Sequence, residues 1–79
     1  MSMNIEMEKK IGENIRRLRL RAGLTQDLLA TRLQLAGCDI TRSAVAKIEV
    51  AQRHLYPDEI VLIARILGVT CDELLKTED

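Results

Sequence analysis

Apolar residues recur every three or four positions through most of the chain, and this spacing predicts short amphipathic helices. The first helix is expected over residues 6–22, with Gly23 as its left-handed C-terminal cap. The second helix follows Thr25, whose side chain suits an N-cap, and ends at Gly37. The apolar residues of these two helices are Met7, Ile11, Ile15, Leu18 and Ala22, followed by Leu29, Ala30 and Leu33.

Three further helices are expected in the second half of the chain. Thr41 can cap a third helix over residues 42–50, and Pro57 suits the first position of a fourth. Thr70 and Glu73 form a capping box at the start of a short fifth helix. The inward-facing residues are Ala44, Val45 and Ile48 in the third helix and Ile60, Ile63, Ala64 and Leu67 in the fourth, and the fifth helix includes Leu74 and Leu75. We therefore predict an all-α fold, a compact five-helix bundle in one domain over residues 1–79, with an N-terminal extension over about 1–8.

Composition narrows the class of protein. The 79 residues include one aromatic side chain, Tyr56, so an aliphatic core of modest size is expected. The longest uninterrupted apolar run, residues 60–64, is too short to cross a membrane, and the polar N-terminus does not resemble a signal peptide. We therefore expect a cytoplasmic protein. Cys38 and Cys71 lie far apart and the chain has a single histidine, His54, which argues against a metal site, a disulfide framework and a cofactor.

The formal net charge is zero, but the charges are unevenly distributed along the sequence. Residues 1–8 carry a charge of −2, residues 9–53 carry +6 and residues 54–79 carry −4. A basic segment between two acidic ends indicates one surface suited to an anionic partner.

The polar side of the predicted helix 42–50 gives this basic segment a candidate binding surface. Its members, with no carboxylate among them, are Arg42, Ser43, Ala46 and Lys47. A guanidinium can donate two hydrogen bonds to guanine O6 and N7, a lysine reaches the same acceptors, and an alanine methyl can contact a thymine methyl. The alternative is an ordinary solvated helix face, and the residue types alone leave both interpretations open.

Other polar residues also have two interpretations. Gln26 at the start of the second helix, and Arg53 after the third, are candidates for phosphate contacts. Arg16 or Arg17 in the first helix could also lie near a phosphate, and each of these side chains could equally be solvated. The acidic pairs 58–59 and 72–73 fall in first helical turns, where they offset the helix dipole. No catalytic residue, and no enzyme, is therefore predicted.

Three segments in this order resemble the lambda-repressor-like helix-turn-helix regulators of the Cro and XRE group. They are IGENIRRLRLRAGLTQDLLATRL, ITRSAVAKIE and LGVTCDELL, and the resemblance covers about residues 11–75. Its most specific parts are Gly-Leu-Thr-Gln at residues 23–26, Lys-Ile-Glu at 47–49 and Leu-Gly-Val-Thr at 67–70. Each part alone is weak evidence for the resemblance, whereas the three parts in this order and at this spacing are specific to the family.

The resemblance implies a helix-turn-helix over about residues 25–50 that binds double-stranded DNA. Its first helix would cross the DNA backbone and its second would lie in the major groove. By position, the residues facing base edges would be Arg42, Ser43, Ala46 and Lys47. Gln26 and Thr41 would contact the backbone, and Gln26 would also brace the recognition helix. The family further pairs an arginine of the preceding helix with a glutamate, here Arg19 and Glu49.

The sequence departs from the family pattern at three places. Residues 34–40 separate Leu33 from Thr41, where the family has a turn of about three residues, so a longer second helix is expected. Ala51 stands where the family often has glycine. Because alanine disfavours a left-handed cap, the third helix is expected to run on or to exit differently. Leu55 stands at a family proline position, with Pro57 two residues later.

Apolar residues at both ends of the chain suggest a homodimer, although core packing explains part of this pattern. The candidate contacts are Met3, Met7, Leu74 and Leu75. Two-fold regulators bind two half-sites one helical turn apart, so a palindromic operator is expected. We expect a sequence-specific transcription regulator, more a repressor than an activator, that acts by occupying its operator. The alternative is an antitoxin-like or scaffold module whose main partner is a protein, such as a toxin or co-regulator.

Overall fold

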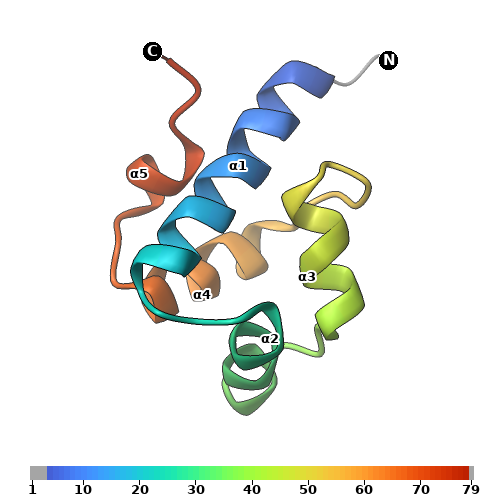
Figure 1. Ribbon diagram of the computed structural model, residues 1–79, viewed down its shortest axis with the longest axis vertical. Helices are drawn as coiled ribbons and strands as arrows, with labels where there is room; N and C mark the ends of the chain where they lie inside the picture. The colour runs from blue at the N-terminus through green and yellow to red at the C-terminus, as the bar shows by residue number, and fades with distance from the viewer. Residues whose placement is uncertain (1–3, 79) are drawn as a thin grey trace.

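The computed structural model describes residues 4–78, which form five helices and no strand. The helices are α1 (Ile5–Arg21), α2 (Gln26–Leu35), α3 (Arg42–Glu49), α4 (Pro57–Leu67) and α5 (Cys71–Leu75). In Figure 1, α1 runs between α5 on one side and α3 on the other, and α2 lies below them. The all-α, five-helix fold predicted from the apolar spacing is confirmed.

Helix α1 begins earlier than expected. Asn4 caps it, with its side-chain oxygen accepting a hydrogen bond from the Met7 backbone nitrogen at 3.1 Å. Residues 6–8, which the sequence assigned both to the first helix and to an N-terminal extension, belong to α1. At the other end, Gly23 has a φ of 75°, the left-handed conformation expected of it. Residues 1–3 lie outside the described part of the chain.

Aliphatic side chains from all five helices form the core. The buried apolar residues are Ile15, Leu18, Leu24, Leu29, Ala30, Leu33, Cys38, Ile40, Val45, Ile48, Ile63, Ala64, Leu67 and Leu74. A fully buried leucine or isoleucine contributes about 1.5–3 kcal/mol relative to an exposed one, so this cluster is the main stabilising feature. Two members of the predicted α1 stripe do not join it, since Met7 and Ala22 are exposed at the helix ends.

The connection from α2 to α3 is longer than a family turn, and local hydrogen bonds order it. Helix α2 extends to Leu35, and Gly37 with a φ of 89° then reverses the chain. The Cys38 backbone nitrogen donates to the Leu33 carbonyl at 2.9 Å, and Gln34 Nε2 donates to the Ile40 carbonyl at 2.8 Å. These contacts hold the segment against the helix, so the extra residues do not leave α3 loosely attached.

Helix α3 ends in a left-handed cap despite lacking the glycine. Ala51 has a φ of 61° and is the one non-glycine residue with positive φ among residues 4–78. Its backbone nitrogen donates to the Ile48 carbonyl at 3.1 Å, and that of Gln52 donates to the Lys47 carbonyl at 2.7 Å. This pair of bonds is the Schellman pattern. The expectation that α3 would run on or exit differently is therefore wrong: alanine adopts the strained conformation.

Helices α1 and α3 approach each other closely at Gly12, a buried residue inside α1. A Cβ atom there would lie 2.6 Å from the Glu49 carbonyl oxygen and 2.7 Å from that of Ile48. Only a residue without a side chain allows this approach, which sets the position of the C-terminal turn of α3 against α1. Within residues 4–78, no helix is both long and apolar enough to cross a membrane.

Candidate nucleic-acid interface

Helix α3 divides into an inward and an outward face, as its sequence predicts. Val45 and Ile48 are buried in the core, and Glu49 is turned inward with 5% exposure. On the outward face Arg42, Ser43 and Lys47 are exposed and Ala46 is half-buried. Because Glu49 is the one carboxylate among residues 42–49, its burial leaves the outward face with cationic, hydroxyl and methyl groups. Such a face can approach a phosphate-lined groove without charge repulsion.

A buried polar network fixes α3 to the two preceding helices. Arg19 Nε donates to Glu49 Oε2 at 2.6 Å, and Nη2 donates to Oε1 at 3.0 Å. Gln26 Nε2 also donates to Glu49 Oε1 at 3.0 Å, and Arg19 Nη1 donates to the Leu24 carbonyl at 2.9 Å. One carboxylate therefore receives hydrogen bonds from α1 and α2, which orients the outward face of α3 relative to α2. Gln26 braces α3 in this way through its amide nitrogen.

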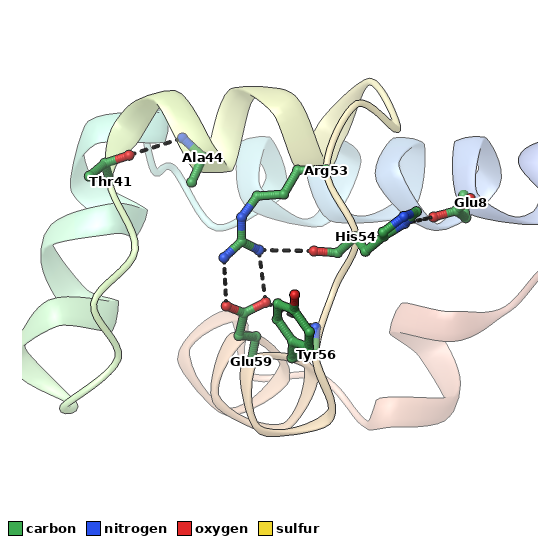
Figure 2. A network of polar contacts seen from close by, with 7 residues as sticks. All are labelled: Glu8, Thr41, Ala44, Arg53, His54, Tyr56 and Glu59. Carbon is green, nitrogen blue, oxygen red and sulfur yellow. Dashed lines mark hydrogen bonds and ion pairs between the residues drawn. The ribbon is translucent and has the colours of Figure 1, made fainter.

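The N-terminal ends of α2 and α3 lie on one surface. Thr25 Oγ1 accepts from the Leu28 backbone nitrogen at 3.0 Å, and Thr41 Oγ1 accepts from that of Ala44 at 3.1 Å (Figure 2). A shallow hollow between the two ends is lined by Thr25, Gln26, Asp27 and Arg42, among other residues. Each threonine uses an oxygen lone pair for the cap, which leaves its hydroxyl proton available for an anion.

Arg53 makes an ion pair within the fold instead of projecting into solvent. Its Nη1 and Nη2 donate to the two carboxylate oxygens of Glu59, each at 2.9 Å, and Nη1 also donates to the His54 carbonyl (Figure 2). The guanidinium lies 5.7 Å from the centre of the Tyr56 ring. The Arg53 hydrogen bonds lower the pKa of Glu59, and the reciprocal contact raises the pKa of Arg53. The predicted phosphate contact would therefore require Arg53 to leave Glu59.

Arg16 and Arg17 lie beside the C-terminal segment of the chain. Both are exposed on α1 and line a hollow together with Asn14, Lys76 and Glu78 near the C-terminal segment. No residue of α2 or α3 lines this hollow. This hollow therefore does not bring the two arginines together with Arg42 and Lys47, and their contact with the DNA backbone stays a prediction.

The dimer candidates separate into different environments. Leu74 is fully buried in the core, so the suggestion that it forms a dimer contact is wrong. Leu75 is half-buried and Met7 is 47% exposed, while Met3 lies outside the described residues. The neighbouring Ile5 is 50% exposed, so the N-terminal turns of α1 carry two apolar side chains in solvent.

Three functional or structural residues were not identified from the sequence. Val50 is 58% exposed and follows Ala46 by four residues and Ser43 by seven, so it extends the outward face of α3. This helical spacing could have revealed it. The close approach at Gly12 and the pairing of Glu59 with Arg53 depend on the fold, and the sequence carries no local signal of either. Burial raises the pKa of the Cys38 thiol, which argues against reactivity there.

The chain matches one family model, described as helix-turn-helix, over residues 15–74. This match includes α2, α3, α4, the last seven of the 17 residues of α1 and all but the last residue of α5. No curated protein matches the chain. The matched range contains the whole network around Glu49 and the outward face of α3.

Proposed function

Because the chain belongs to the Cro/C1-type helix-turn-helix (XRE) family, a family of DNA-binding regulators, we propose that it recognises a specific double-stranded DNA sequence through α3 and represses transcription there. The observation that carries this proposal is the outward face of α3, held in place by a buried carboxylate and free of outward-facing carboxylates within residues 42–49. The match supports DNA binding, and the chemistry of this face supports sequence recognition.

The outward side chains have distinct roles in the proposed complex. Arg42 is suited to bidentate hydrogen bonding with a guanine, and Lys47 to a single contact with the same acceptors. Ser43 can donate or accept a hydrogen bond at a base edge. Ala46 and Val50 present methyl groups, which suit the methyl group of thymine. This combination favours a site that contains both guanine and thymine.

Backbone contacts would come from the N-terminal ends of α2 and α3. The unpaired backbone N–H groups of a helix N-terminus attract a phosphate, and the Thr41 hydroxyl can donate to the same anion. One hydrogen of Gln26 Nε2 would stay bonded to Glu49 Oε1, and the second would lie near the DNA. Asp27 is the one carboxylate that lines the same hollow, and it would limit how deeply a phosphate enters.

Repression would follow from occupancy of an operator by a homodimer. The described part of the chain measures 33 × 24 × 19 Å, so two copies side by side can place their α3 helices about 34 Å apart, one turn of DNA. Met7 and Leu75 are the remaining apolar candidates for the contact between copies. A dimer bound across a promoter would exclude the transcription machinery without further chemistry.

Selection of bound duplexes from a random DNA pool tests this proposal directly. The expected result is a palindromic consensus with half-sites about 10 base pairs apart, because each copy reads one half-site. Recovery of no preferred sequence, by folded protein that still retains duplex DNA, would contradict sequence recognition by α3. A consensus with a single half-site would contradict the dimer and leave recognition intact.

A second function is favoured by the apolar residues on the surface of α2. Leu28 is 48% exposed and Leu35 is 83% exposed, and their separation of seven residues places them on one side of the helix. An antitoxin-like or scaffold module would use such residues to dock a protein. Salt dependence separates the two functions, because DNA affinity falls steeply with ionic strength whereas apolar docking changes little.

A further inference from the structure

Uncharged side chains of α3 and its C-cap form a row between the two cations of the outward face. Val50, the C-cap, follows Ala46 by four residues and Ser43 by seven, so the turns of the helix place the three on one line. At about 100° per residue, Arg42 lies on one side of this row and Lys47 on the other. The middle of the outward face is therefore uncharged, with methyl groups and one hydroxyl.

Val50 is the apolar side chain of this row that extends furthest into solvent. Its exposure is 58%, whereas Ala46 is half-buried and ends at Cβ. The core does not account for Val50, because Val45 and Ile48 supply the buried apolar side of α3. An isopropyl group in solvent is apolar surface that a ligand can remove from water, which favours binding.

The backbone around Val50 does not oppose the approach of DNA. Carbonyl groups at a helix C-terminus carry partial negative charge, which a phosphate repels. Here the Lys47 carbonyl accepts from the Gln52 backbone nitrogen at 2.7 Å, and the Ile48 carbonyl accepts from that of Ala51 at 3.1 Å. The left-handed cap therefore satisfies these carbonyls within the chain and leaves Val50 as an apolar contact at the end of the helix.

An apolar side chain in the major groove distinguishes pyrimidines at ring carbon C5. Thymine carries a methyl group there, and cytosine does not. 5-Methylcytosine carries a methyl group on the same ring carbon. A valine that contacts this position therefore buries apolar surface with either methylated base, and less with uracil or cytosine.

Val50 and Ala46 would contact different base pairs. Four residues of helix correspond to about 6 Å along the axis, and successive base pairs are separated by about 3.4 Å. Val50 would therefore lie about two base pairs beyond the one that Ala46 faces. Its contribution can be measured separately from that of Ala46, at its own position in the DNA.

We propose that Val50 makes DNA binding depend on a pyrimidine C5-methyl group, so that cytosine methylation at the contacted position raises affinity for the site. This inference rests on the proposed function, because it requires α3 to lie in the major groove. It adds a residue that determines specificity and a chemical modification of DNA to which the protein responds. Thymine and 5-methylcytosine both supply the methyl group, and 5-methylcytosine would partly replace thymine at that position.

The first experiment removes single methyl groups from the DNA. In duplexes with the selected consensus, each thymine is replaced in turn by uracil, and affinity is measured by fluorescence anisotropy. The wild type should bind about fourfold more weakly at one thymine per bound copy, as expected for one buried methyl group. Val50→Ala should bind thymine and uracil equally there. Val61→Ala, which truncates an exposed valine of α4, is the matched control and should keep the loss.

The second experiment adds the methyl group to cytosine. At the same position the T·A pair is replaced by C·G, with and without a C5-methyl group on the cytosine. The wild type should bind the methylated duplex about fourfold more tightly than the unmethylated one, and Val50→Ala should bind both equally. A gain with thymine and none with 5-methylcytosine would overturn the response to cytosine methylation.

The remaining outcomes also overturn the inference. A consensus without thymine, or one that tolerates uracil at every thymine, would show that no methyl group is read, although sequence recognition stands. A loss with uracil that Val50→Ala retains would assign the methyl contact to another residue, such as Ala46. If no sequence is selected at all, the proposed function fails and the inference fails with it. Val50→Ala removes exposed atoms, so its circular dichroism spectrum should match that of the wild type.

Discussion

Arg19 and Glu49 form a bidentate ion pair between α1 and the last residue of α3, with both side chains almost fully buried. The pair lies at the edge of the outward face of α3, since Glu49 follows Arg42 by seven residues and Arg19 lines the same hollow as Arg42. Gln26 adds a hydrogen bond from α2 to the same carboxylate. Helices α1, α2 and α3 therefore meet at one charged group, the Glu49 carboxylate. The orientation of the outward face of α3 depends on that group.

Glu49→Ala should lower the free energy of unfolding by about 3 kcal/mol or more, because it leaves the Arg19 charge buried without a partner. Urea denaturation monitored by circular dichroism measures the change. The double variant Arg19→Met, Glu49→Leu should recover part of the loss, since it buries no charge. A loss below about 0.5 kcal/mol for Glu49→Ala would mean that the pair behaves as an exposed surface pair.

Gly12→Ala should destabilise the protein by about 2 kcal/mol or more, although alanine is favoured over glycine in a helix by about 1 kcal/mol. The added methyl group would overlap the carbonyl oxygens of Ile48 and Glu49, so α3 must move away from α1. Glu13→Ala at the next position, which is exposed, is the matched control and should change stability by less than about 0.5 kcal/mol. A stabilised Gly12→Ala variant would show that α3 shifts freely, contrary to the close contact described above.

The helices could be predicted from the sequence because their signals are local. Apolar spacing and the caps at Thr25, Thr41 and Thr70 each involve residues within one or two turns, and the structure has these caps. The burial of Leu74 was missed because α5 packs on α1 and α4, a contact between distant parts of the chain. A five-residue helix gives too little periodicity to show which of two adjacent leucines faces inward.

The candidate interface was partly predictable for the same reason. Which residues share the outward face of α3 follows from helical geometry, whereas their alignment with α2 depends on Glu49 and its partners. Arg53 illustrates the limit of the sequence. A basic residue after a recognition helix suggests a phosphate contact, but the fold brings a buried carboxylate, Glu59, against it. The pairing has no signal in sequence spacing.

Ala51→Gly should stabilise the protein by about 0.5–1 kcal/mol. At a φ of 61°, alanine carries a steric cost of about 1–2 kcal/mol that glycine avoids, and the greater freedom of glycine in the unfolded chain offsets part of the gain. Thermal unfolding monitored by calorimetry measures the effect. Ala36→Gly, at the α2 C-cap with a φ of −85°, is the control and should not stabilise. Equal effects of the two substitutions would contradict strain at Ala51.

The pair formed by Arg53 and Glu59 should make stability depend on pH. Its hydrogen bonds lower the pKa of Glu59 below the ordinary value of 4.5, so the carboxylate is stabilised in the folded state. This contribution is complete above the pKa of the unfolded chain, and it is lost as the pH falls through the lower pKa of the folded state. The advantage of the wild type over Glu59→Gln in urea unfolding should therefore shrink as the pH drops below 4.5. If the difference in free energy of unfolding between the two proteins stays constant until acid unfolds them, the charge of Glu59 does not stabilise the fold.

Arg42→Ala and Lys47→Ala should each weaken binding to the selected DNA sequence by about 1–3 kcal/mol and relax the preference at one or two base positions. Arg65→Ala removes an equal charge from an exposed position in the last turn of α4, which holds none of the candidate contacts, and is the matched control. It should change affinity by less than about 0.5 kcal/mol at physiological salt, where charges beyond about 8 Å are largely screened. Fluorescence anisotropy with the consensus duplex and with duplexes changed at single positions measures both affinity and base preference.

A different outcome would assign these side chains to phosphates. In that case Arg42→Ala and Lys47→Ala weaken binding to all duplexes equally, and each reduces the salt dependence of binding by about one charge. Base recognition would then have to come from Ser43, Ala46 and Val50. Their side chains are short, so they would reach only the bases that face α3 directly.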